Sequence, residues 1–489
     1  MAHTLKAYYY TDPATAVTVD FYGAVADTDG IAVDSYQMGI PGIEQARNNS
    51  LYSDSPRPVY SKHGTVTDVL TVTVRGSTNT NLYTNLHLLA KLGEYARQAQ
   101  QTPLERQQAY LKLKPGGSSS GENLYATIYD CRIELPQDWA MSQDATLTIE
   151  DVTVTIERGL WCKGPPSYPA ELIYPNADTN LSKTSQAFAS SGSSTLDIGG
   201  DTSAQFFMTA DHQGSTSGAI DRLIIGYRSK AQGGAYYANL GKREAESETL
   251  GTDTSGTADA TASGGNVARC TQTTSPSTPA ARVSKASIVP YGTHRVFARM
   301  KITGTAVSSV YMNYQDETTA NGSTLIPNTA VSVSSTSWLV YDLGIVRAFQ
   351  GTYGVILDNT VRGSYSLYSS LTSGSGNLDI DWVYFMPTEG YITLQNVGIG
   401  TSTPTSNFTA VVNNHYNFPI ATVYYGGAGS NVGSVRPLAS TVSLDPVPGP
   451  FALYWLAGTD SGSVFDVDIL TSLNIGFATN PRYLMPSVV

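Results

Sequence analysis

The chain has 489 residues, with 29 Lys or Arg against 40 Asp or Glu, so its formal net charge is −11. This balance excludes a general affinity for the nucleic-acid backbone, which requires clustered positive charge. Hydrophobic residues make up 41% and aromatic residues 10% of the chain, which is too many for a disordered protein. The 31 Tyr and 45 Gly, with many Thr and Val, predict a mainly β protein of two to four domains, at roughly 100–200 residues each.

The cysteines and the start of the sequence give little sign of secretion. Cys131, Cys162 and Cys270 are widely spaced and include no CxxC pair, so neither a zinc site nor a disulfide framework is indicated. The first residues lack the basic region and apolar core of a signal peptide. No apolar run approaches the 18 or so residues of a membrane span. We therefore expect a protein that is made in a cytoplasm without membrane association, and that either stays soluble there or leaves by a route that needs no signal peptide.

Residues 1–166 change from strand periodicity to helix periodicity and back. Apolar residues alternate with polar ones around Val17–Phe21 and Leu70–Val74, which predicts strands. Between Asn79 and Gln101 they recur at steps of three and four instead, which predicts an amphipathic helix ended by Pro103. The expected apolar face of this helix comprises Leu82, Leu86, Leu89, Ala90, Gly93 and Ala96.

Three further strand segments follow the helix, at Tyr110–Lys114, Asn123–Glu134 and Thr146–Arg158. In the last segment the apolar positions shift from odd to even numbers at Glu150–Asp151. A shift of phase within a strand predicts a β-bulge or a bend. The Pro165–Pro166 pair ends regular structure, so we place the first domain at residues 1–166.

Residues 167–390 read as a second domain with many short strands. Alternating apolar residues mark one buried face in each of Val296–Ile302, Leu339–Ile345 and Leu378–Tyr384. Short strands separated by turns, without a helix, favour a β-sandwich. Residues 391–489 remain β-rich, with clear runs at Phe451–Trp455 and Val464–Leu473.

Local signatures of catalysis are missing. The six histidines form no metal-binding spacing, and neither a GxSxG elbow nor a GxxxxGK[ST] loop occurs. Asp379 and Asp381 project from the same side of one predicted strand. They are compatible with a solvated strand face or turn, with a calcium site made from hard oxygen ligands, or with a catalytic carboxylate pair. We expect no enzymatic activity and no cofactor, apart from a possible calcium ion at Asp379 and Asp381.

Aromatic residues are the other candidates for a binding site. Tyr236 and Tyr237 lie between Gly233-Gly234 and Asn239, which is typical of a loop, and they are candidate carbohydrate-stacking residues. Trp338, Tyr341 and Trp382 are further candidates, but Trp338 and Trp382 lie within apolar alternation, which also fits core packing.

The first region resembles the tail-tube and distal-tail family of long-tailed bacteriophages. The similar residues are Val69–Gly76 (VLTVTVRG), the helix Asn79–Gln101, and Val152–Trp161 (VTVTIERGLW), which closes with Arg-x-x-Trp. The resemblance implies a β-sandwich with one flanking helix that assembles into rings around a channel. The terminal Asn480–Leu484 (NPRYL) is similar to the final strand of such proteins. On that basis residues 391–489 are expected to help complete the ring domain, with the middle domain as an insertion.

The middle region is similar to carbohydrate-binding jelly rolls. The similar residues are Glu244–Glu246 (EAE), Ala262–Gly265 (ASGG), His294–Arg299 (HRVFAR), Trp338–Gly344 (WLVYDLG) and Leu378–Pro387 (LDIDWVYFMP). The strands predicted upstream, in residues 198–228, are additional to those of a minimal module. The resemblance therefore does not decide whether this domain has a sugar-binding site.

Together these resemblances imply a structural protein of the virion tail, made in the bacterial host cytoplasm, either a tail-tube or a distal-tail subunit. Its expected partners are further copies of itself, other tail proteins and, through an outward jelly roll, host-surface glycan. DNA would pass through the acidic channel without specific binding. The alternative is a glycan-binding tail adhesin. A third class is a polysaccharide depolymerase. Such enzymes usually have long parallel β-helix repeats or an obvious acid pair, and this sequence shows neither.

Overall fold

The structure is a computed structural model. It describes residues 4–12, 15–21, 29–48, 57–102, 107–115, 123–136, 147–164, 180–183, 188–189, 196–198, 200–212, 222–229, 241–271, 281–283, 292–316, 330–348, 363–387, 390–395, 408–413, 420–425, 431–435, 448–461, 464–466 and 473–486. The chain divides into two compact units, and each is described separately. The first contains Met1–Pro175, Gly199–Ala204 and Thr479–Val489, and the second contains Asn176–Ile198 and Gln205–Ala478. Residues 391–478 of the predicted C-terminal region thus lie in the second unit, and residues 479–489 in the first.

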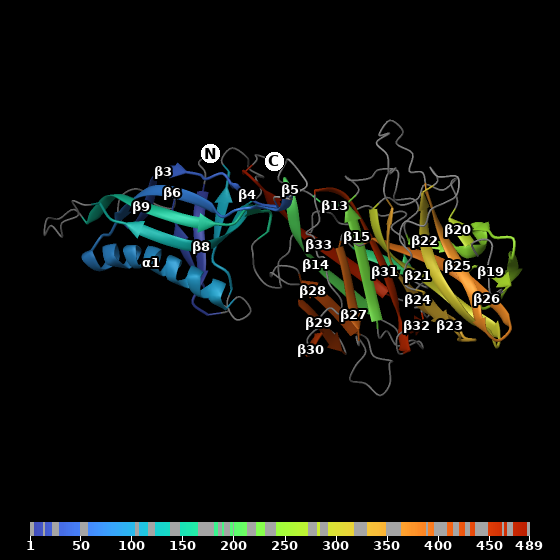
Figure 1. Cartoon of the computed structure of the whole chain (residues 1–489). Helices are drawn as coiled ribbons and strands as arrows, with labels where there is room; N and C mark the ends of the chain where they lie inside the picture. Colours follow the sequence, from blue (N-terminus) through green and yellow to red (C-terminus); the bar gives the residue numbers. More distant parts are fainter. Residues whose placement is uncertain are drawn as a thin grey trace. The chain divides into compact units, whose positions relative to one another are not determined.

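In its described residues, the first unit is a β-sandwich of two antiparallel sheets with one α-helix (Figure 1). Its elements are β1 (Thr4–Tyr10), β2 (Ala16–Asp20), β3 (Gly30–Gln37), β4 (Ile43–Asn48), β5 (Arg57–His63), β6 (Val66–Arg75), α1 (Asn79–Gln101), β7 (Tyr110–Lys114), β8 (Leu124–Glu134), β9 (Thr148–Arg158) and β10 (Trp161–Cys162). One sheet has the order β2-β1-β7-β8-β10, the other has the order β3-β6-β9-β8, and β4 pairs only with β5. At β10, Trp161 pairs with Tyr483 of β33 (Leu473–Tyr483).

Helix α1 begins and ends where the sequence predicts. The side chain of Thr78 caps its first turn by accepting a hydrogen bond from the Asn81 amide at 3.2 Å. The buried residues are Leu82, Leu89, Leu92, Gly93, Ala96 and Ala99. Ala90, which we placed on the apolar face, is exposed, because a stripe through Leu89, Leu92 and Ala96 leaves it on the outer side. No helix in the described part of the chain is both long and apolar enough to cross a membrane.

Gly93 lets α1 approach strand β8 closely. A Cβ atom at this position would lie 2.2 Å from the carbonyl oxygen of Cys131. The backbone of α1 at Gly93 therefore packs directly against the backbone of β8 at Cys131, and any larger residue at position 93 would push the two elements apart. Leu5, Phe21, Leu70, Val154 and further apolar side chains from both sheets and from α1 fill the space between them.

The predicted bulge in β9 is confirmed. The pairing of β9 with β6 shifts register between Val72 and Val74, opposite Glu150 and Asp151. Asp151 has φ = 58°, a left-handed conformation that an aspartate tolerates better than most residues. The extra residue restores the buried alternation of Val152, Val154 and Ile156 after the slip.

The Arg-x-x-Trp segment of the first unit surrounds a buried ion pair. Arg158 donates from Nε and Nη2 to the two carboxylate oxygens of Asp68, at 2.5 and 3.0 Å. Its guanidinium carbon lies 4.4 Å from the centre of the Trp161 ring. The Tyr36 hydroxyl and the Gly39 amide also donate to Asp68, at 2.7 and 2.8 Å. Both carboxylate oxygens of this buried acid are therefore fully used.

The second unit consists of strands and one short 3-10 helix in its described part. Its elements are β11 (Asn180–Lys183), β12 (Phe188–Ala189), β13 (Leu196–Ile198), β14 (Thr202–His212), β15 (Arg222–Ser229), β16 (Gly241–Glu244), η3 (Ala245–Ser247), β17 (Thr249–Leu250), β18 (Thr254–Ala258), β19 (Asn266–Thr271), β20 (Ala281–Val283), β21 (Gly292–Gly304), β22 (Val307–Asp316), β23 (Val331–Val333), β24 (Leu339–Ala348), β25 (Gly363–Ser373), β26 (Gly376–Pro387), β27 (Gly390–Gln395), β28 (Phe408–Asn413), β29 (Ile420–Tyr425), β30 (Asn431–Val435), β31 (Gly449–Ser461), β32 (Val464–Asp466) and most of β33.

A large sheet and a five-stranded sheet form the sandwich of the second unit. The large sheet has the order β18-β19-β26-β21-β24-β32-β31-β15-β27, and the other has the order β17-β20-β25-β22-β23. The predicted faces Val296–Ile302 and Leu378–Tyr384 are confirmed, since their alternating apolar residues are all buried. In Leu339–Ile345 the expectation holds for Tyr341 and Leu343, but Leu339 is only half-buried and Ile345 is exposed. The fold class is therefore mainly β, as predicted.

Candidate functional site

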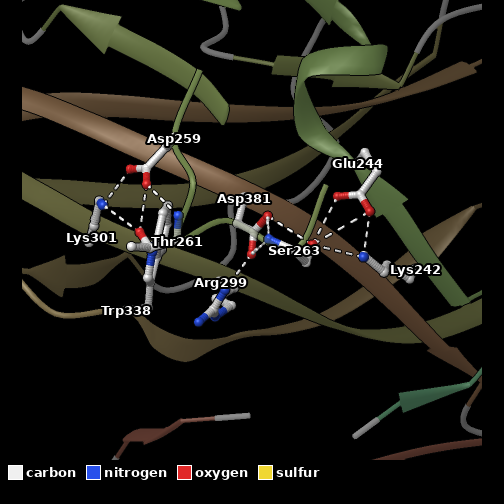
Figure 2. A network of polar contacts seen from close by, with 9 residues as sticks. All are labelled: Lys242, Glu244, Asp259, Thr261, Ser263, Arg299, Lys301, Trp338 and Asp381. Carbon is white, nitrogen blue, oxygen red and sulfur yellow. Dashed lines mark hydrogen bonds and ion pairs between the residues drawn. The ribbon is translucent and has the colours of Figure 1, made fainter. Parts of the chain in front are cut away.

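A network of polar contacts in the second unit lies on the large sheet and on the loop between β18 and β19. We call it the polar network (Figure 2). Its members are Lys242, Glu244, Asp259, Thr261, Ser263, Arg299, Lys301, Trp338 and Asp381. Strands β16, β21 and β26 supply five of the side chains, the loop of residues 259–265 supplies three, and Trp338 directly precedes β24. The loop is tight, with the Asp259 amide donating to the Gly265 carbonyl at 3.0 Å.

Asp381 lies at the centre of the polar network. Arg299 donates to its Oδ2 at 2.6 Å, and the Ser263 amide and hydroxyl lie 3.0 and 2.9 Å from its Oδ1. The carboxylate is fully buried. It takes this position because β21 and β26 shift register between Arg299 and Met300, which leaves Asp381 as the extra residue of a bulge. A buried charge of this kind requires the partners that the loop and β21 provide.

A second set of contacts fixes Trp338. Its indole nitrogen donates to the Thr261 hydroxyl at 2.9 Å, and that hydroxyl in turn lies 2.6 Å from Oδ1 of Asp259. Lys301 donates to Oδ2 of the same carboxylate at 2.5 Å, and its ammonium lies 4.3 Å from the centre of the Trp338 ring. The hydrogen bond from Lys301 holds the pKa of Asp259 well below its usual range, with the Thr261 hydroxyl adding to the effect.

Three carboxylates gather around Ser263 and Gly264. Lys242 forms an ion pair with Glu244 and donates to the Ser263 hydroxyl at 2.8 Å. A Cβ on Gly264 would lie 3.3 Å from Oε1 of Glu246 and 3.4 Å from the carboxyl carbon of Glu244. Burial raises the pKa of Glu246, and the negative charges of Glu244 and Asp381 raise it further. Its Oε2 atom is buried without a hydrogen-bond partner.

The candidate site residues predicted from the sequence have different surroundings in the structure. Asp379 receives two hydrogen bonds from Arg269, at 2.7 and 2.8 Å, and is fully buried. Asp379 and Asp381 therefore do not share a ligand position, and neither lies on a solvated strand face. Trp382 and Tyr341 pack in the core. Tyr236 and Tyr237 lie outside the described residues.

Sequence reasoning missed the basic half of this site. Arg299 and Lys301 alternate with buried apolar residues on β21, so periodicity places them on a polar face without indicating their partners. The sequence marks the ASGG segment only by its resemblance to a motif, whereas in the structure its Ser263 connects Asp381, Glu244 and Lys242. Among the described residues, no group of three or more His, Cys, Asp or Glu side chains is arranged to hold a metal as it stands.

No protein-family model matches the chain, and no curated protein matches its sequence. Among solved structures, the phage p2 baseplate in its activated conformation is similar over 78% of this chain and 98% of that chain, at 8% identity and a TM-score of 0.23. The Dit protein of phage SPP1 covers 78% of this chain and 99% of its own length, at 10% identity and a TM-score of 0.21. The CBM22-1 xylan-binding domain from Paenibacillus barcinonensis covers 36% of this chain and 99% of its own length, at 14% identity and a TM-score of 0.20. At these scores the likeness to phage tail and carbohydrate-binding folds is coarse.

Proposed function

We propose that this protein is a structural component of a bacteriophage tail, whose first unit assembles with further copies into rings of the tail-tube or distal-tail type. The supporting observation is the order of elements around α1. The segments that resemble that family, Val69–Gly76, Asn79–Gln101 and Val152–Trp161, become β6, α1 and β9–β10 of one sandwich. The buried Asp68–Arg158 pair joins strand β6 to strand β9.

In this proposal the rings surround a channel through which DNA passes without specific binding. A net charge of −11 favours sliding, because negative surface repels phosphate. The jelly roll projects outward and contacts other tail proteins or a host-surface glycan. The protein is made in the host cytoplasm and resides in the virion tail.

Negative-stain electron microscopy of the purified chain at rising concentration tests the proposal. Rings, or rings stacked into tubes of regular repeat, are the expected result. Stacked rings would favour a tail-tube subunit and isolated rings a distal-tail subunit. Monomers or compact trimers at every concentration would overturn the ring proposal and favour an adhesin.

The alternative is a glycan-binding tail adhesin, in which the jelly roll carries the function. The observation in its favour is the EAE, ASGG and LDIDW segments, which meet at the polar network. In a glycan array, replacing Tyr236 and Tyr237 by Ala should abolish binding. Replacing Ser255, an exposed residue of β18, by Ala is the control. Absence of glycan binding by the unmodified chain would count against this alternative.

A calcium ion in the jelly roll is a further part of the proposal. Asp381, Glu244 and Glu246 fit it better than Asp379, because they face one loop and Glu246 has a buried oxygen without a partner. Carboxylate oxygens are the ligands that calcium prefers, and the ion would hold the loop on the sheet.

The proposal includes no enzymatic activity. Release of reducing ends from a bacterial polysaccharide by the purified chain would contradict it and favour a depolymerase.

A further inference from the structure

The outer face of one sheet in the first unit carries a cluster of tyrosines and lysines, which we call the Tyr–Lys face. It consists of Lys6, Tyr8 and Tyr10 on β1, Tyr110, Lys112 and Lys114 on β7, and Tyr125 on β8. All are partly exposed, whereas Leu5, Ala7, Leu111 and Leu113 between them are buried. The Tyr8 and Tyr110 rings stack with centroids 4.9 Å apart, and Tyr110 meets Tyr125 edge-on at 5.8 Å.

The charges of this face are not balanced within it. Lys6 and Lys112 are directly opposite each other across β1 and β7, an arrangement of like charges that destabilises a sheet. Lys6 forms an ion pair with Asp20 of β2, with 2.6 Å between Nζ and Oδ2. Lys112 lies 5.7 Å from the centre of the Tyr125 ring, and in the described part of the chain neither it nor Lys114 is paired with a carboxylate. The face is therefore basic on a chain that is acidic overall.

The outer face of the other sheet has the opposite character, and we call it the Thr–Glu face. It consists of Thr71 on β6, Arg132 and Glu134 on β8, and Glu150, Asp151, Thr153, Thr155 and Glu157 on β9, so acids outnumber the single cation. Glu134 lies opposite Thr153, beside the bulge that exposes Glu150 and Asp151. Arg132 lies 3.7 Å from Glu157, but Glu134, Glu150 and Asp151 have no cation partner among the described residues.

We infer that the Tyr–Lys face of one copy docks on the Thr–Glu face of the next copy. This inference rests on the proposed ring assembly and names the surfaces that form it. The two faces differ and their charges are complementary, so contact between them is head to tail and repeats from copy to copy. Half-buried tyrosines that already pack on one another lose little side-chain freedom on docking, which favours them at protein interfaces.

The tyrosine geometry favours a protein over a sugar on this face. Tyr8 and Tyr110 stack with an interplanar angle of 21°, so each ring covers one face of the other. A sugar stacks on a free ring face, but Tyr110, on the strand between β1 and β8, has Tyr8 on one side and Tyr125 on the other. A second copy can instead use the ring edges and hydroxyls together with the lysines.

Two charge-reversal variants of the full chain test the inference. Variant A carries Lys112→Glu and Lys114→Glu, and variant B carries Glu134→Lys, Glu150→Lys and Glu157→Lys. In variant A both docking faces are negative, and in variant B both are positive. Each variant alone should therefore require at least about tenfold more protein to assemble than the unmodified chain. An equimolar mixture of A and B should restore assembly, because every contact is then between opposite charges.

Sedimentation velocity and negative-stain microscopy give the readout, with circular dichroism to show that each variant is folded. Asp253→Lys, at an exposed position of the second unit, is the control and should assemble normally. If the unmodified chain assembles and variants A and B do so equally well, the inference is wrong and the ring proposal stands. If the unmodified chain stays monomeric at every concentration, both are wrong. Loss of binding to a glycan or a polyanion in variant A, with assembly intact, would assign the Tyr–Lys face to that ligand instead.

Discussion

The two units use ion pairs in different ways. In the first, the Asp68–Arg158 pair is enclosed, with side chains 0% and 1% exposed. Tyr36 adds a hydroxyl donor whose own pKa is raised by burial and by the Asp68 charge. In the second, a series of pairs follows the outer side of the large sheet. There the carboxylates of Asp379 and Asp381 are fully buried, but the guanidinium of Arg269 is 31% exposed.

This difference in burial determines whether water can solvate the arginine after its carboxylate partner is removed. Water reaches the Arg269 guanidinium, so the loss of its partner Asp379 is partly compensated. Water does not reach Arg158, so removal of Asp68 leaves a buried, uncompensated charge. Burial of the cation, more than the number of pairs, therefore sets the cost, and variants that differ in burial test this conclusion.

The largest effect is expected for Asp68→Asn. The variant keeps the shape of the side chain but leaves the Arg158 guanidinium enclosed without its counter-charge. The free energy of unfolding of the first unit should fall by about 3–5 kcal/mol, measured by urea unfolding followed by circular dichroism. Thr67→Ala, on the neighbouring exposed position, should cost much less. A loss below about 1 kcal/mol for Asp68→Asn would show that the pair is not essential to this fold.

Asp379→Asn in the second unit should have an intermediate effect. The acid is enclosed, but Arg269 can turn toward water, so we expect a loss of about 1–3 kcal/mol in the same measurement. The matched variant is Asp342→Asn, which breaks the Arg295–Asp342 pair on the same sheet. That pair has both side chains about 30% exposed (28% and 31%), so the expected loss is about 0–1 kcal/mol. Equal losses for the two variants would contradict the role assigned to burial.

The pH dependence of Asp259 provides a third test. Hydrogen bonds from Lys301 and Thr261 lower the pKa of Asp259 in the folded chain. In the unfolded chain the pKa of an aspartate is about 3.9. The stabilisation is therefore fully present above that unfolded value and is lost as the pH falls toward the folded pKa. The difference in melting temperature between the unmodified chain and Asp259→Asn should be constant from about pH 5 to 8 and shrink below about pH 4. A difference that stays constant into acid would contradict the assignment.

Local periodicity was sufficient to predict much of the fold. It located α1, β6 and the bulge at Asp151, because the spacing of apolar residues fixes which side of an element is buried. It misassigned Ala90, since a small residue fits either side of a helix. It could not pair Asp68 with Arg158, which are 90 residues apart, because such a partnership depends on strand register.

The candidate site was harder to predict for the same reason. Asp379 and Asp381 are two residues apart and look equivalent in sequence, but a bulge opposite Arg299 changes the surroundings of Asp381. One acid therefore pairs with Arg269 on β19, and the other faces Ser263 and the glutamates of β16 and η3. Alternation along one strand contains no information about the register of its neighbours, and that register decides both environments.

The smallest effect on stability, with the clearest effect on ligand binding, is expected for Lys242→Gln. The Lys242–Glu244 pair is partly exposed, so its loss should cost about 0–1 kcal/mol. The substitution also removes the ammonium that neutralises Glu244, leaving three carboxylates around Ser263 with Arg299 as their main counter-charge. Calcium, which prefers several carboxylate oxygens, should then raise the melting temperature more in Lys242→Gln than in the unmodified chain. Lys242→Arg keeps the charge and should respond as the unmodified chain does. Equal calcium responses in all three proteins would exclude Glu244 as a ligand and refute the proposed calcium site.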